Sequence, residues 1–98
     1  MMFHVTARHR PEDCPHRSPE VEAAVSSHRS LADMAAETGV QVHIAVSAAP
    51  DHVFYAVLES DDFGAIRRLL DAGHVIPQEF DIVPVLPLAE AFQYRRQW

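Results

Sequence analysis

Histidine and cysteine are the residues of this sequence best suited to chemistry. The chain has seven histidines and one cysteine among 98 residues. His9 and His16 flank the cysteine, Cys14, within the segment ARHRPEDCPH (7–16). Imidazole nitrogens and thiolate sulfur are ligands for zinc, copper and related metals. The segment therefore predicts a transition-metal site, provided that the fold brings further histidines to it.

Hydrophobic periodicity and turn residues divide the chain into the elements that must position these side chains. The expected order is strand, helix, strand, strand, helix, strand, followed by a tail. The elements are expected at residues 2–8, 19–38, 40–47, 52–59, 61–73 and 80–86, with the tail at 87–98.

Local signals support these boundaries. Ser18 is a helix N-cap residue followed by proline at the first helical position, and Gly39 stands where a left-handed residue ends a helix. Gly73 ends the second helix in the same way. Pro84 predicts an edge position for the last strand, because proline has no N–H to donate to a neighbouring strand.

This order of elements predicts an α+β fold of the ferredoxin-like type, a βαββαβ arrangement over a single domain at 1–98. Right-handed crossovers give a four-stranded antiparallel sheet in the order 4-1-3-2, with two helices on one face. In the strand at 52–59, the side chains that alternate to the two faces are apolar on both sides, so both faces of the sheet are expected to be buried. A second copy would cover the open face, which predicts a homodimer forming a dimeric α/β barrel, with 87–98 as a dimer latch.

The predicted topology gathers residues that are distant in the sequence. The first strand ends where the third begins, at one rim of the sheet, so His9 is expected close to His52. The same rim should receive the loops that follow the first strand and the second helix. The metal-site candidates are His9, Cys14, His52, His74 and His16.

Other side chains are expected on the open face of the sheet. The alternating apolar residues of the strand at 40–47 should face the helices. The residues between them, which include Gln41, His43 and Ser47, should then lie on the opposite face. In a dimer this face would line a cleft for a small-molecule ligand. The cleft candidates are His4, Thr6, His43 and Tyr55.

The same residues could also have purely structural roles or no specific role. The histidines of the rim could be exposed loop residues without a ligand. Cys14 could be a reactive thiol beside His16 and Arg17, or an inert structural one. His4 and His43 could be hydrogen-bonded structural residues rather than acid–base groups.

Composition excludes several function classes. The net charge is −6, from 14 acidic and 8 basic residues, so no broad basic field attracts nucleic acid. No apolar stretch reaches the roughly 20 residues that span a bilayer, and no membrane partner is expected. One cysteine makes no internal disulfide, and the N-terminus has no leader pattern, so a cytoplasmic location is expected.

The opening MMFHV (1–5) and the closing strand FDIV (80–83) resemble those of muconolactone isomerases. The layout of residues 1–88 resembles the dimeric α/β-barrel superfamily of small ferredoxin-like proteins, which includes isomerases, cofactor-free monooxygenases and haem proteins. The loop at 10–15 departs from the isomerase pattern and is similar to that of uncharacterised small members. The resemblance therefore implies a fold and a site, and no catalytic residue is carried across.

Three functions follow from these observations. The first is a homodimeric metal-binding protein that acts as a carrier, sensor or metal-dependent enzyme, with zinc or copper as the ion and haem disfavoured. The second is an isomerase- or monooxygenase-like enzyme that acts on a small organic ligand in the cleft. The third is a structural or binding dimer without metal.

Overall fold

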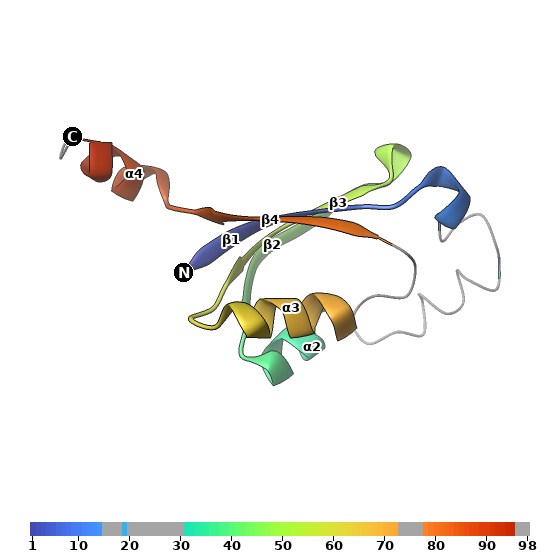
Figure 1. The fold of residues 1–98 in the computed structure, drawn as a ribbon, viewed down its shortest axis with the longest axis horizontal. Helices are drawn as coiled ribbons and strands as arrows, with labels where there is room; N and C mark the ends of the chain where they lie inside the picture. Colours follow the sequence, from blue (N-terminus) through green and yellow to red (C-terminus); the bar gives the residue numbers. More distant parts are fainter. Residues whose placement is uncertain (15–18, 20–30, 73–77, 96–98) are drawn as a thin grey trace.

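A four-stranded antiparallel sheet with helices on one face forms the body of the protein (Figure 1). The computed structural model describes residues 1–14, 19, 31–72 and 78–95. The order β2-β3-β1-β4 is the predicted order read from the other edge, so the ferredoxin-like α+β class is confirmed. The strands are β1 (Met2–Arg8), β2 (Gln41–Ala48), β3 (Val53–Glu59) and β4 (Glu79–Val85). The helices are α2 (Leu31–Thr38), α3 (Phe63–Ala72) and α4 (Leu88–Arg95).

The two helices that cover the sheet each have a recognisable signal at one end. Gly39 follows α2 with a φ of 75°, a left-handed conformation that glycine adopts without steric cost. Asp62 caps α3, because its Oδ1 accepts a hydrogen bond of 2.8 Å from the backbone N–H of Gly64. The predicted helix at 19–38 is described only at residue 19 and over α2, and Gly73 lies outside the described residues.

The core lies between the sheet and the two helices α2 and α3. In β1, Phe3, Val5 and Ala7 alternate with more polar residues and are all buried on the helix side. The most fully buried large side chains come from β1, β3 and α3. They are Leu58, Ile66, Leu69 and Val5. The strand β4 lies at the edge of the sheet, as Pro84 predicts.

A β-bulge in β2 overturns the expected orientation of half of that strand. Val42 pairs with Leu58 of the buried face, but the next paired residue is Ile44, which lies opposite Val57. The extra residue reverses the parity, so Ile44 and Val46 point to the open face of the sheet rather than to the helices. Sequence alternation alone does not reveal such an insertion.

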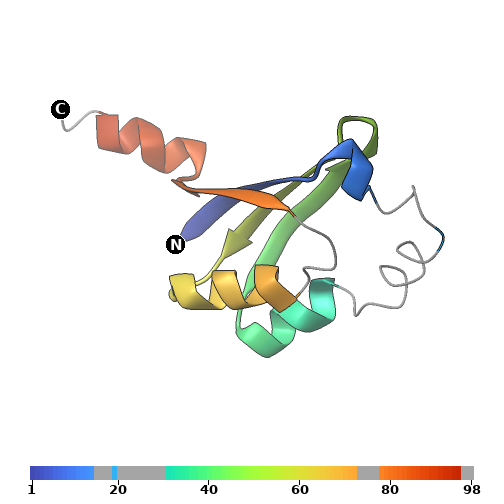
Figure 2. The same ribbon diagram turned by 45° about the vertical axis from the view of Figure 1, so that its right-hand side comes forward.

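The open face is consequently more apolar than the sequence pattern predicts. Ile44, Val46 and Val83 are exposed to 52%, 48% and 52%, and Tyr55 lies on the same face. The helix α4 extends away from the body of the molecule in both views (Figures 1 and 2). Its residues Leu88 and Phe92 are exposed to 71% and 53%, so both keep much of their apolar surface in contact with water.

The molecule is elongated for its length. The Cα radius of gyration is 15.3 Å and the extents are 53 × 29 × 17 Å. A compact chain of about 100 residues has a radius of gyration of about 13 Å. Among the described residues, no helix combines the length and apolarity needed to cross a membrane.

Candidate metal centre

The candidate centre lies at the end of the sheet opposite α4, where two loops lie side by side (Figure 2). His9 directly follows β1 and His52 directly precedes β3, and these two strands are antiparallel neighbours. The backbone N–H of His9 donates to the carbonyl oxygen of His52 at 3.2 Å, which extends the strand pairing by one residue. The predicted proximity of the two histidines is therefore confirmed.

The local backbone directs His52 toward this point. The 3-10 turn η3 (Ala49–Asp51) ends at His52, whose N–H donates to the carbonyl of Ala49 at 3.1 Å. His52 has φ 57° and ψ 40°, the left-handed conformation, and it is the one described non-glycine residue with positive φ. This conformation costs an L-residue about 1 kcal/mol. Strain of this kind is often kept at functional sites, because it holds a side chain in a required place.

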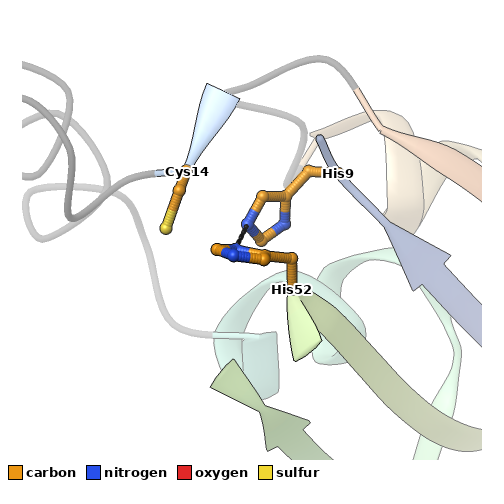
Figure 3. A group of neighbouring side chains, drawn as sticks. All are labelled: His9, Cys14 and His52. Atoms are coloured by element: carbon orange, nitrogen blue, oxygen red, sulfur yellow. Dashed lines mark hydrogen bonds between the residues drawn. The ribbon is translucent and has the colours of Figure 1, made fainter. Parts of the chain in front are cut away.

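The two imidazoles meet through the nitrogen atoms that would bind a metal. His52 Nδ1 and His9 Nε2 are 3.2 Å apart, with the rings edge to face at 78° (Figure 3). Two nitrogens that bind one tetrahedral ion at about 2.0 Å lie about 3.3 Å apart. The hydrogen bond thus holds the two nitrogens at nearly the spacing that a shared ion requires.

Cys14 supplies the third donor. The 3-10 turn η1 (Pro11–Asp13) leads into it, and the Cys14 N–H donates to the carbonyl of Pro11 at 3.2 Å. Ligand atoms of His9, Cys14 and His52 all lie within 4.8 Å of one another, and all three residues are half-buried (Figure 3). A tetrahedral ion would bring sulfur and nitrogen to about 3.6 Å, which requires a shift of about 1 Å at most.

The electrostatic environment favours a neutral His9. Its partial burial and the positive charge of His52 lower the pKa of His9 below the ordinary value of 6.5, and the carboxylate of Asp13 opposes this shift. Neutral imidazole is the form that binds metal ions. His9 is therefore ready to act as a ligand at neutral pH.

The lowered pKa of His9 predicts how the metal-free protein responds to acid. Protonation of His9 is easier in the unfolded chain, so its contribution to stability is present above about pH 6.5 and is lost as the pH falls through the lowered pKa. Urea denaturation with a chelator present should show a smaller loss of unfolding free energy on acidification for His9→Gln than for the natural chain. Identical pH slopes for the two proteins would refute this expectation.

The left-handed backbone of His52 allows a matched pair of substitutions. His52→Gly and His52→Ala both remove the imidazole, but only glycine relieves the steric cost of positive φ. We expect both variants to lose metal binding, with His52→Gly more stable than His52→Ala by about 1 kcal/mol in urea denaturation of the metal-free proteins. Equal stability would show that the left-handed conformation is not strained, and retained binding would exclude His52 as a ligand.

An open cavity adjoins one of the three candidate ligands. An open cavity of about 400 Å³ has His9 in its wall, so the same imidazole belongs to both the cavity and the cluster. An ion held by three protein donors could present a further coordination position to a solvent molecule or a ligand. The cavity is lined by Arg8, His9, Arg10, Asp13, Gln78 and Glu79.

Two of the five predicted metal-site residues, His16 and His74, lie outside the described residues. The predicted cleft residues are distributed over the open face of the sheet. Thr6 pairs with Tyr55, and the rings of His4 and Tyr55 are 6.1 Å apart.

His43, the remaining cleft residue, occupies the bulge of β2. Its Nε2 lies 2.7 Å from Oε1 of Glu59, the carboxylate at the end of β3. Sequence reasoning missed this partner, since the bulge that places His43 next to Glu59 leaves no mark in the alternation of residues.

Comparison with known proteins identifies a family without an assigned activity. Residues 1–97 match the family described as "Domain of unknown function (DUF3303)". No curated protein matches the sequence significantly. One similar solved structure is described as a "putative transposase" from Deinococcus radiodurans R1, with 16% sequence identity and a TM-score of 0.49. That match covers 99% of this chain and 89% of the other, and we draw no functional conclusion from it.

Proposed function

This chain belongs to the DUF3303 family, and we propose that it binds a transition-metal ion through His9, Cys14 and His52. The observation that carries the proposal is the convergence of the three donors, whose ligand atoms lie within 4.8 Å of one another although His52 is 43 residues from His9. The strand pairing and the two 3-10 turns create this convergence without any ion.

The donor set favours zinc or copper. One thiolate and two neutral imidazoles combine a soft ligand with two borderline ligands, which suits Zn²⁺ and Cu⁺ and does not suit Mg²⁺ or Ca²⁺. With three donors in the described part of the chain, the ion keeps room for a further ligand. Such a site fits a carrier, a sensor or a metal-dependent enzyme.

Elemental analysis tests this proposal. Protein purified without a histidine tag and dialysed against zinc, or against copper(I) under reducing conditions, should retain about one ion per chain. His43→Gln is the matched control, because it removes an imidazole outside the cluster. Protein without retained zinc or copper, or equal losses in His43→Gln and His52→Ala, would refute the proposal.

The functional unit that we propose is a homodimer, in which a second copy covers the open face of the sheet. Exposed apolar residues on that face (Ile44, Val46 and Val83) and on α4 (Leu88 and Phe92) support it. One chain thus presents an apolar surface on its sheet and two exposed apolar side chains on a helix that extends away from its own body (Figure 1). A two-fold arrangement would bury both, because each copy would give its α4 to the other.

A second candidate function is an enzyme that acts on a small organic ligand on the open face. The 2.7 Å contact between His43 and Glu59 supports it, since a carboxylate that orients an imidazole leaves the other ring nitrogen available for proton transfer. Under this hypothesis, His43→Ala impairs turnover whereas Cys14→Ser does not. Under the metal hypothesis, Cys14→Ser loses metal binding whereas His43→Ala keeps it.

A further inference from the structure

We propose that Arg10 is a positioning residue that holds the thiol of Cys14 at coordination distance from the two histidines. This inference rests on the proposed metal site and names the group that completes it. Arg10 itself does not bind the ion. It acts on η1, the turn that carries Cys14.

Arg10 stabilises this turn through both its backbone and its side chain. The carbonyl oxygen of Arg10 accepts a hydrogen bond of 2.9 Å from the backbone N–H of Asp13. The guanidinium Nε of Arg10 donates to Oδ2 of Asp13 at 2.9 Å and lies 3.4 Å from Oε1 of Glu12. Asp13 is the residue directly before Cys14, so both contacts fix the backbone from which the thiol extends.

Cys14 depends on such support more than the histidines do. His9 and His52 are held by the pairing of β1 with β3 and by their mutual hydrogen bond. Cys14 lies outside any strand, and its backbone N–H is held by a single turn bond to Pro11. The thiol is therefore the donor whose position is least fixed by the sheet.

The partial burial of Asp13 makes its ion pair with Arg10 more important than an exposed surface pair. The side chain of Asp13 is only 20% exposed, although that of Arg10 is 71% exposed. Loss of the guanidinium would leave a largely buried carboxylate without this charged partner, which favours rearrangement of the turn. The second contact, to Glu12, makes a small network rather than an isolated surface pair.

Charge alone predicts the opposite effect, which makes the inference testable. Removal of a positive residue beside a cation site strengthens cation binding by simple electrostatics. Arg8 is the matched control: it lines the same cavity as Arg10, but its guanidinium pairs with Asp81 of the neighbouring strand β4 at 2.7 Å rather than with the acidic residues of η1. Arg8→Gln therefore removes the same charge while leaving the turn intact.

Cobalt(II) and zinc titrations of Arg10→Gln and Arg8→Gln, in the full chain, test the inference. We expect Arg10→Gln to weaken zinc binding about tenfold and to reduce the thiolate-to-cobalt charge-transfer absorption, because supporting groups of metal ligands have effects of this size. Arg8→Gln should bind as tightly as the natural chain or more tightly. Natural affinity and absorption in Arg10→Gln would overturn the positioning role.

A double-mutant cycle separates this role from a general loss of structure. In a Cys14→Ser background the substitution Arg10→Gln should cause no further loss of zinc affinity, because Arg10 supports binding only through the thiol. An equal tenfold loss in both backgrounds would contradict the inference while leaving the metal site itself in place. A natural chain that fails to bind either ion would instead refute the proposed function.

Discussion

Cys14→Ser is expected to weaken zinc binding at least about a hundredfold, since the loss of outer-shell partners alone costs 10- to 100-fold. Cys14 supplies the only thiol of the sequence, and a serine hydroxyl is a poor ligand for zinc and for copper(I). The fold should persist, because Cys14 is half-buried at the rim and lies outside the core between the sheet and the helices. Competition with a chromophoric chelator measures the change in affinity.

The control for Cys14→Ser is again His43→Gln, which should leave zinc affinity unchanged because His43 contacts Glu59 at the bulge of β2. Circular dichroism of the metal-free proteins checks that both variants keep the native secondary structure. A folded Cys14→Ser protein that binds zinc as tightly as the natural chain would exclude the thiol as a ligand. The histidine pair would then have to bind ions without it.

Val46→Asp is expected to convert the proposed homodimer into a monomer at low micromolar concentration. Val46 lies opposite Tyr55 on the open face, exposed to 48% in a single chain, and a partner sheet would bury it. An unpaired carboxylate at the centre of an apolar interface costs several kcal/mol, which raises the dissociation constant at least about a hundredfold. Light scattering coupled to size exclusion measures the molar mass.

Ser47→Asp is the matched control for this substitution. Ser47 is the next residue of β2 and lies opposite Phe54, so its side chain lies on the helix side of the sheet. The same charge there should leave the dimer intact. Equal dissociation in both variants would mean that charge on β2 disturbs the strand itself, and a natural chain that is monomeric would contradict the dimer.

Much of the fold follows from the sequence because its signals are local. The period of buried residues in β1, the left-handed Gly39 after α2 and Pro84 in an edge strand each depend on a few neighbouring residues. Together with right-handed connections they leave one strand order, and that order brings His9 to His52. The histidine pair was therefore predictable although 43 residues separate its members.

Other features depend on register, which the sequence does not specify. The bulge at His43 reverses the direction of Ile44 and Val46, and it brings His43 to Glu59. The positive φ of His52 is likewise a property of the turn before β3. Alternating apolar residues predict a strand but give no sign of an inserted residue, so the apolar character of the open face was underestimated.

The ion pairs around the site were also not predictable. Glu12 and Asp13 both lie within 4.0 Å of the Arg10 guanidinium. The 3-10 turn η1 creates these contacts by bringing Arg10 back over the two residues before Cys14. Such contacts depend on the conformation of a short loop, which composition alone does not determine.

The most direct test of the metal site is a cobalt(II) titration of the tag-free natural chain, because cobalt(II) reports both the geometry and the sulfur ligation of a zinc site. We predict intense visible bands of a tetrahedral ion and a thiolate charge-transfer band in the near ultraviolet, both saturating at about one equivalent per chain. Both signals should vanish on addition of excess zinc. The weak spectrum of hydrated cobalt(II) at every ratio would contradict the proposal that His9, Cys14 and His52 form a metal centre.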